Sequence, residues 1–187
     1  MPTVHKSRRS QCSVLSMTLL ILIAATGLTC RSQSATAGET QIRAAMLFNL
    51  TKFIDWPAEK MGGAQAPFVI GYVGDDGVGN ELNQLMRGKQ VQGRSIVVQS
   101  IFNATQVMQC HIVYVANSGR KQYRQLVPQL SRQAVLIVSE RQLGDSGVMI
   151  ALPLIDNSIQ IQVDLKEAQS SGLTISSKLL RIAAVTR

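Results

Sequence analysis

Apolar residues recur with a helical period between residues 42 and 56. One face of a 3.6-residue helix carries the members of this stripe, which are Ile42, Ala45, Met46, Leu50 and Phe53. Pro57 biases Trp56 out of the helical region, so the pattern predicts a short helix that ends at Trp56. Leu47 and Phe48 lie off the stripe, which makes this helix apolar over more than one face.

This apolar breadth has two interpretations. Both faces are buried between a sheet and a C-terminal helix, or Leu47 and Phe48 belong to an exposed patch that binds a partner or a second copy of the chain in a homodimer. Trp56 has the same two interpretations, because a large aromatic side chain serves either a core or a binding hot spot. Leu47, Phe48 and Trp56 are therefore the candidate partner-binding residues.

Strand and helix patterns alternate along the following segment. Buried strands are predicted at 67–73, 95–101, 110–115 and 134–138, where β-branched and other apolar residues cluster between turn residues. Helices are predicted at 78–86 and 120–130, with Pro128 near the end of the second, and 102–108 is expected to be a short helix or a turn.

The C-terminal part predicts a hairpin and a final helix. Segments 148–154 and 159–165 are joined by Asp156 and Asn157, and the second segment alternates apolar and polar residues. Residues 166–171 predict a helical turn, and Ser176 or Ser177 is expected to cap a helix through Ala184. Together these elements predict a single α/β domain, with a mixed sheet of about six strands flanked by helices, a C-terminal β-hairpin and a final helix.

The N-terminal segment has the features of an export signal. Lys6, Arg8 and Arg9 form a basic start, and residues 14–28 are apolar but too few to span a bilayer. The small residues of Ala35-Thr36-Ala37 predict cleavage before Gly38, which gives a signal peptide at 1–37 and a domain at 38–187. An uncleaved anchor is the alternative.

Cleavage would change the charge and the cysteine content. The whole chain has a net charge of +8, but the signal takes four basic residues and no acidic one with it, leaving 15 basic and 11 acidic residues. The scattered net charge of +4 argues against nucleic-acid binding. Cys110 alone remains, so no internal disulfide is expected, and a buried thiol is favoured over an intermolecular bridge.

The sequence predicts no catalytic site, metal site or cofactor. His111 is the only histidine of 38–187, and as a strand neighbour of Cys110 it points to the opposite face, so the two cannot form a dyad. We expect His111 to be hydrogen-bonded at the sheet surface. Glycines 71, 74, 77 and 79 do not complete a phosphate-binding fingerprint, and Asp75 and Asp76 are ordinary turn residues. A hydrolase would require Asp75, Asp76 and His111 to converge.

Several motifs in order resemble one family. They are Phe48-Asn49, Phe53-x-x-Trp56-Pro57, Phe68-Val69-Ile70-Gly71, Gly74-Asp75-Asp76, the turn from Gly88-Lys89 to Gly93-Arg94, Cys110-His111-Ile112, and Gly172-Leu173-x-Ile175-Ser176-Ser177-Lys178-Leu179-Leu180. From Gln41 to Ala183 the chain resembles the YfiR family of periplasmic proteins. Some members carry additional cysteines in internal disulfides, whereas Cys110 has no partner here.

The resemblance implies a non-enzymatic function. Such a protein represses a membrane diguanylate cyclase by binding its periplasmic sensor region, and an outer-membrane lipoprotein with an OmpA-like domain sequesters the repressor, which raises cyclic di-GMP and biofilm formation. A periplasmic small-ligand sensor is the alternative function. If the first and last helices pack together, Trp56, Lys60, Ser177 and Lys178 would form a small anionic-ligand site.

Overall fold

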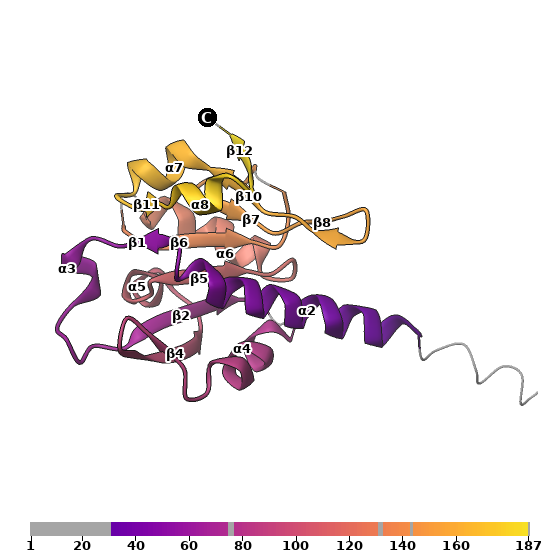
Figure 1. Ribbon diagram of the computed structural model, residues 1–187, viewed down its shortest axis with the longest axis horizontal. Helices are drawn as coiled ribbons and strands as arrows, with labels where there is room; N and C mark the ends of the chain where they lie inside the picture. Colours follow the sequence, from indigo (N-terminus) through magenta and orange to yellow (C-terminus); the bar gives the residue numbers. More distant parts are fainter. Residues whose placement is uncertain (1–30, 75–76, 131–132, 143, 187) are drawn as a thin grey trace, which may run out of the picture. The chain divides into compact units, whose positions relative to one another are not determined.

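The computed structural model describes residues 31–74, 77–130, 133–142 and 144–186 (Figure 1). Side chains are described from Gly38 onward. The chain divides between Ala37 and Gly38 into two units, and the features below belong to the second, Gly38–Arg187. The predicted signal lies outside the described residues up to position 30. Across the described ranges, no helix combines the length and the apolar character needed to cross a membrane.

The core of the domain is an eight-stranded mixed sheet. Its parallel centre consists of β4 (Arg94–Ser100), β2 (Phe68–Val73), β5 (Ile112–Val115), β6 (Leu136–Ser139) and β7 (Ile150–Ala151), in that spatial order. Short strands extend both edges: β3 (Gln90–Val91) pairs antiparallel with β4, β10 (Gln162–Asp164) pairs antiparallel with β7, and β12 (Ala184–Thr186) pairs parallel with β10. The predicted α/β class with a mixed sheet is confirmed, with eight strands instead of about six.

Helices cover both faces of this sheet. Residues of α2 (Arg31–Leu50) and α4 (Val78–Met86) share one buried cluster with Ile112 and Tyr114 of β5. On the other face, α5 (Ala104–Gln109) and α6 (Arg120–Leu126) share a second cluster with Val113 and Val115. Because β5 is buried on both faces, it is apolar throughout, as expected of a central parallel strand. Pro128 lies in a short 3₁₀ turn, Val127–Gln129, that follows α6.

The first helix ends six residues earlier than predicted. After Leu50 the chain turns and forms β1 (Ile54–Asp55), which pairs antiparallel with β11 (Thr174–Ile175). The Ser176 N–H also donates to the Phe53 carbonyl at 2.8 Å, so pairing with a distant segment replaces the last predicted turns of helix. The predicted stripe is wrong as well, because Ile42 is 53% exposed while Leu47 is fully buried.

The predicted C-terminal hairpin is present, with its strands interrupted. Asp156 and Asn157 both have positive φ and join β8 (Leu154–Ile155) to β9 (Ser158–Ile159), while β7 and β10 pair further inward. Between β10 and β11 lies the helix α7 (Leu165–Ser170). Ser176 caps the final helix α8 (Ser177–Leu180), but the prediction that this helix continues through Ala184 is wrong. The helix ends in a turn, and Ala184 begins β12, because the open edge of β10 offers backbone partners.

Candidate functional site

Trp56 lies in an aromatic cluster with Phe68 and His111. It is 8% exposed, and its indole N–H donates to the His111 carbonyl at 3.1 Å. The Trp56 and Phe68 rings meet edge to face with centroids 5.0 Å apart, and the His111 ring stacks on Phe68 at 4.5 Å. These contacts make Trp56 a core residue, and its hydrogen bond holds the backbone of His111, the residue before β5.

His111 is buried, so its predicted position at the sheet surface is wrong. The side chain is 4% exposed; Nδ1 accepts from the Val69 N–H at 3.0 Å, and Nε2 has no hydrogen-bond partner among the described residues. Burial, aided by the nearby positive charge of Lys60, lowers the pKa of His111 to about 4. The imidazole therefore stays neutral at physiological pH.

Cys110 is the buried thiol that the sequence predicts. It is fully buried; its Sγ lies 3.2 Å from the Gln106 carbonyl oxygen, and burial raises its pKa to about 11. Cys110 belongs to the α5/α6 cluster, whereas His111 stacks on Phe68 of the other cluster. This arrangement gives the thiol no activating base, since a reactive cysteine needs a lowered pKa. Asp75 and Asp76, the other residues of the hydrolase alternative, lie outside the described residues.

The residues of the predicted anionic-ligand site are only partly brought together. Pairing of β1 with β11 places the chain next to Trp56 beside the start of α8, as that hypothesis requires. Ser177 and Lys178 are exposed on α8, whereas the Lys60 Nζ donates to the Met108 carbonyl of α5 at 2.6 Å. Burial lowers the pKa of Lys60. A ligand at these four residues remains a prediction.

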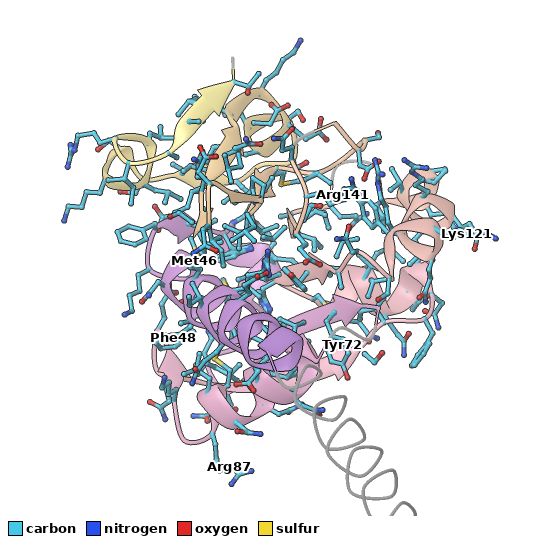
Figure 2. All side chains as sticks on the ribbon, turned by 90° about the vertical axis from the view of Figure 1, so that its right-hand side faces the viewer. Met46, Phe48, Tyr72, Arg87, Lys121 and Arg141 are labelled. Carbon is cyan, nitrogen blue, oxygen red and sulfur yellow. The ribbon has the colours of Figure 1, made fainter. Side chains whose placement is uncertain are left out.

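Leu47 and Phe48 separate into a core residue and a surface residue. Leu47 is fully buried on the inner side of α2, which agrees with the first interpretation of this residue, burial in the core. Phe48 is half-buried, with the ammonium groups of Lys52 and Lys89 lying 5.0 and 4.7 Å from its ring centroid (Figure 2). Phe48 is thus the candidate partner-binding residue with the most accessible ring.

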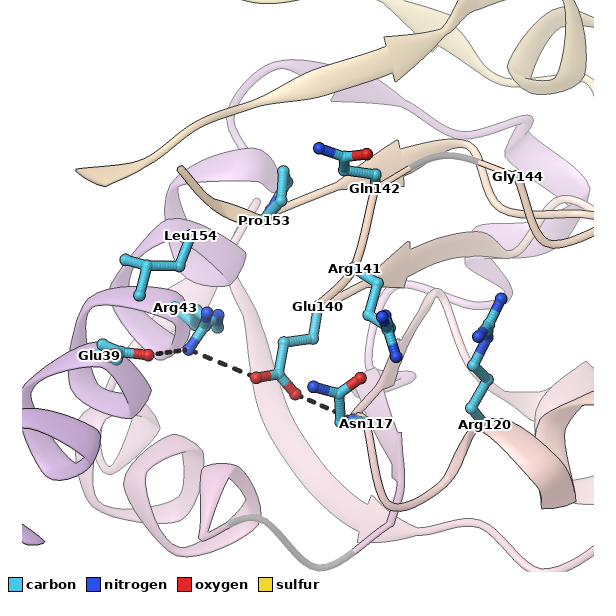
Figure 3. A pocket seen from close by; sticks show the side chains of 10 residues that line it. All are labelled: Glu39, Arg43, Asn117, Arg120, Glu140, Arg141, Gln142, Gly144, Pro153 and Leu154. Atoms are coloured by element: carbon cyan, nitrogen blue, oxygen red, sulfur yellow. Dashed lines mark hydrogen bonds and ion pairs between the residues drawn. The ribbon is translucent and has the colours of Figure 1, made fainter. Parts of the chain in front are cut away.

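A cleft of about 720 Å³ opens where β5 and β6 end (Figure 3). Asn117 and Arg120 follow β5, Glu140 and Arg141 follow β6, and Leu154 of the hairpin completes one side. The helix α2 forms another wall. The residues that line this cleft range in sequence from Glu39 to Leu154.

Arg43 is the most buried charged group in the walls of the cleft. It is 4% exposed, and its guanidinium lies 3.2 Å from a Glu39 carboxylate oxygen and 3.6 Å from one of Glu140. The Arg43 Nε also donates to the Leu152 carbonyl at 3.4 Å, while Glu140 accepts from the Asn117 N–H at 2.9 Å. The network ties α2 to the ends of β5 and β6. The sequence prediction did not include this network. Its one local sign is a charged residue, Arg43, beside Ala44 in an otherwise apolar stretch.

The glycine-rich segment after β2 allows close packing. Gly74 has φ +100°, and a Cβ there would lie 2.6 Å from the backbone nitrogen of Gly119. A side chain at this position would force the loops after β2 and β5 apart. Gly74 therefore brings together the strand ends next to the cleft.

Comparison with known proteins gives a family match for the sequence and a similar solved structure for the fold. A family model described as YfiR/HmsC-like matches residues 40–184. No curated protein matches this chain in sequence. A solved structure described as the ABC domain in complex with L-Trp from Streptococcus pneumonia is similar, with a TM-score of 0.51 and 11% identity over 78% of this chain and 59% of that one. This chain thus spans less than two thirds of that structure, and the likeness shows the fold alone.

Proposed function

The chain belongs to the YfiR/HmsC-like family, and from this premise we propose that it represses an inner-membrane diguanylate cyclase by binding the cyclase's periplasmic sensor region. The observation that carries the proposal is the family match from residue 40 to residue 184, which covers nearly all of the described domain. Family members are regulatory proteins of the periplasm and not catalysts. Repression would keep cyclic di-GMP low and so limit biofilm formation.

The outer face of α2 is the surface that we propose for the cyclase. Ile42 is 53% exposed on this helix, and Phe48 presents part of its ring between two lysines. Exposed apolar and aromatic side chains are the groups through which protein-binding surfaces gain most of their affinity. An outer-membrane lipoprotein with an OmpA-like domain would compete for the repressor and release the cyclase.

Truncation of Phe48 tests this surface. We expect Phe48→Ala to weaken binding to the purified periplasmic region of the cyclase by about tenfold or more, because hot-spot truncations cost about 2 kcal/mol. Phe102→Ala is the matched control, since Phe102 is 69% exposed but lies outside α2. Calorimetric titration measures both affinities, and thermal melting checks that each variant is folded.

The result can contradict the proposal in two ways. If wild-type protein does not bind the cyclase region, repression through that region is excluded. If Phe48→Ala and Phe102→Ala bind as tightly as the wild type, the contact lies elsewhere and the proposed surface is wrong.

The alternative function, a periplasmic small-ligand sensor, is favoured by the cleft at the ends of β5 and β6. A sensor of this kind would be stabilised by its ligand through mass action, so thermal-shift screening of metabolites separates it from a repressor that binds protein alone.

A further inference from the structure

The cleft lies at the edge of the sheet where α/β proteins commonly hold ligands. The chain passes from β2 to β4 on one side of β2 and then to β5 on the other, so the strand order reverses between β2 and β5. Ligands bind outside the carboxyl ends of strands near such a point. Asn117 at the end of β5 and Glu140 at the end of β6 line the cleft, so it lies outside the carboxyl ends of the parallel strands, next to this point of reversal.

The charges around the cleft are unbalanced. Arg43 lies between the carboxylates of Glu39 and Glu140, so these three groups largely satisfy one another. Arg120 and Arg124 share the single carboxylate of Asp145, with donor–acceptor distances of 2.9 and 3.1 Å. Within the described part of the chain, the Arg141 guanidinium has no ion-pair partner. Positive charge therefore exceeds negative charge on the side formed by Arg120 and Arg141.

Arg120 and Arg141 both line the cleft. In Figure 3 the Arg141 side chain comes from the segment that follows β6, and the Arg120 side chain comes from the start of α6. Like charges that line one site repel each other, and a bound anion relieves this repulsion. Arg120 already makes two parallel hydrogen bonds with the Asp145 carboxylate, whereas the Arg141 guanidinium can hold an oxyanion through two such bonds. From this geometry we propose that the cleft binds a small metabolite through a carboxylate or phosphate group held by Arg120 and Arg141.

The rest of the cleft fits a compact polar ligand. Its volume of about 720 Å³ falls within the range of roughly 300–1,000 Å³ usual for small-molecule sites. Pro153 and Leu154 supply a short apolar wall, and the amide of Gln142 offers a further polar group. Because Glu39 and Arg43 of α2 also line the cleft, a bound ligand would contact the same helix that carries Phe48.

Calorimetric titration of the purified protein with citrate, and separately with inorganic phosphate, tests this site at constant ionic strength. We expect one of the two anions to bind at a single site with a Kd below about 1 mM. Arg141→Gln should weaken that binding about tenfold or more, because it removes a charged donor from the anion. The matched control is Lys121→Gln, which removes one positive charge from an exposed position on α6 that points away from the domain (Figure 2).

Three outcomes would overturn the proposal: neither anion binds, Arg141→Gln binds as tightly as the wild type, or Lys121→Gln loses as much affinity as Arg141→Gln. The last outcome would mean that the anion responds to overall charge and not to the cleft. Tighter binding of citrate would indicate that the site recognises a carboxylate, and tighter binding of inorganic phosphate would indicate that it recognises a phosphate group. Phe48→Ala should leave anion binding unchanged, so failure of this proposal is distinguishable from failure of cyclase binding.

Discussion

At the residue scale, the buried imidazole of His111 is the most consequential single group. Its ring stacks on Phe68 and accepts one backbone hydrogen bond, and the His111 carbonyl accepts a hydrogen bond from the Trp56 indole. Its surroundings favour the neutral ring, because a charge there would lose solvation and lie near Lys60. Protonation of His111 would therefore destabilise the aromatic cluster.

We predict that acidification destabilises the protein through His111. The pKa of this group is about 4 in the folded protein and about 6.5 when unfolded, so the unfolded chain takes up the proton first. Its stabilising contribution is complete above about pH 6.5 and is lost as the pH falls towards 4, by about 3 kcal/mol in total. Urea unfolding at a series of pH values between 4 and 8 measures the loss.

His111→Gln is the control for that titration, because glutamine keeps polar character but does not titrate in this range. The variant should show a flatter dependence of the unfolding free energy on pH than the wild type. An unchanged slope in the variant would mean that other groups cause the acid sensitivity.

Residue-level predictions from the sequence succeeded where burial alone decided the outcome. Cys110 follows the general preference of free cysteine for the interior, and it is fully buried. His111 was misplaced because its environment is made by Trp56 and Phe68, which lie 55 and 43 positions earlier in the chain. No local pattern around His111 reports these neighbours.

At the element scale, α2 is fixed to the sheet by the charged network of Arg43 as well as by Leu47 and Leu50. We predict that Arg43→Gln lowers the unfolding free energy by about 3–5 kcal/mol, because it leaves the carboxylates of Glu39 and Glu140 without their buried partner. Chemical denaturation measures this change.

Glu39→Gln is the matched comparison, because it breaks the more exposed pair of the same arginine and leaves Glu140 in place. We expect a loss of only about 0.3–0.5 kcal/mol, the range of i,i+4 helix pairs. Equal losses in the two variants would contradict the view that the contact with Glu140 anchors the helix.

The sequence predicted elements well where each had its own apolar pattern. The helix at 78–86 has the predicted bounds, and the strands at 67–73 and 95–101 are displaced by no more than one residue. Predictions failed where a distant segment changed the local preference. Pairing with β11 ends the first helix early, and pairing with β10 converts the end of the predicted last helix into β12.

At the scale of the whole molecule, the alternation of strands and helices was sufficient to predict the α/β class. It was not sufficient to predict the cleft. Arg43 and Glu140 are 97 positions apart in the sequence and meet only because α2 packs across the ends of β5 and β6. A site assembled in this way has no spacing or motif from which it could be predicted.

Repression of a diguanylate cyclase, as we propose it, would set the level of cyclic di-GMP in the cell. The most direct test is the cellular level of cyclic di-GMP after deletion of the gene and after restoration of the wild-type copy. We predict that deletion raises cyclic di-GMP and that the restored copy returns it to the original level. An unchanged level in the deletion strain under several growth conditions would contradict repression of a cyclase by this protein.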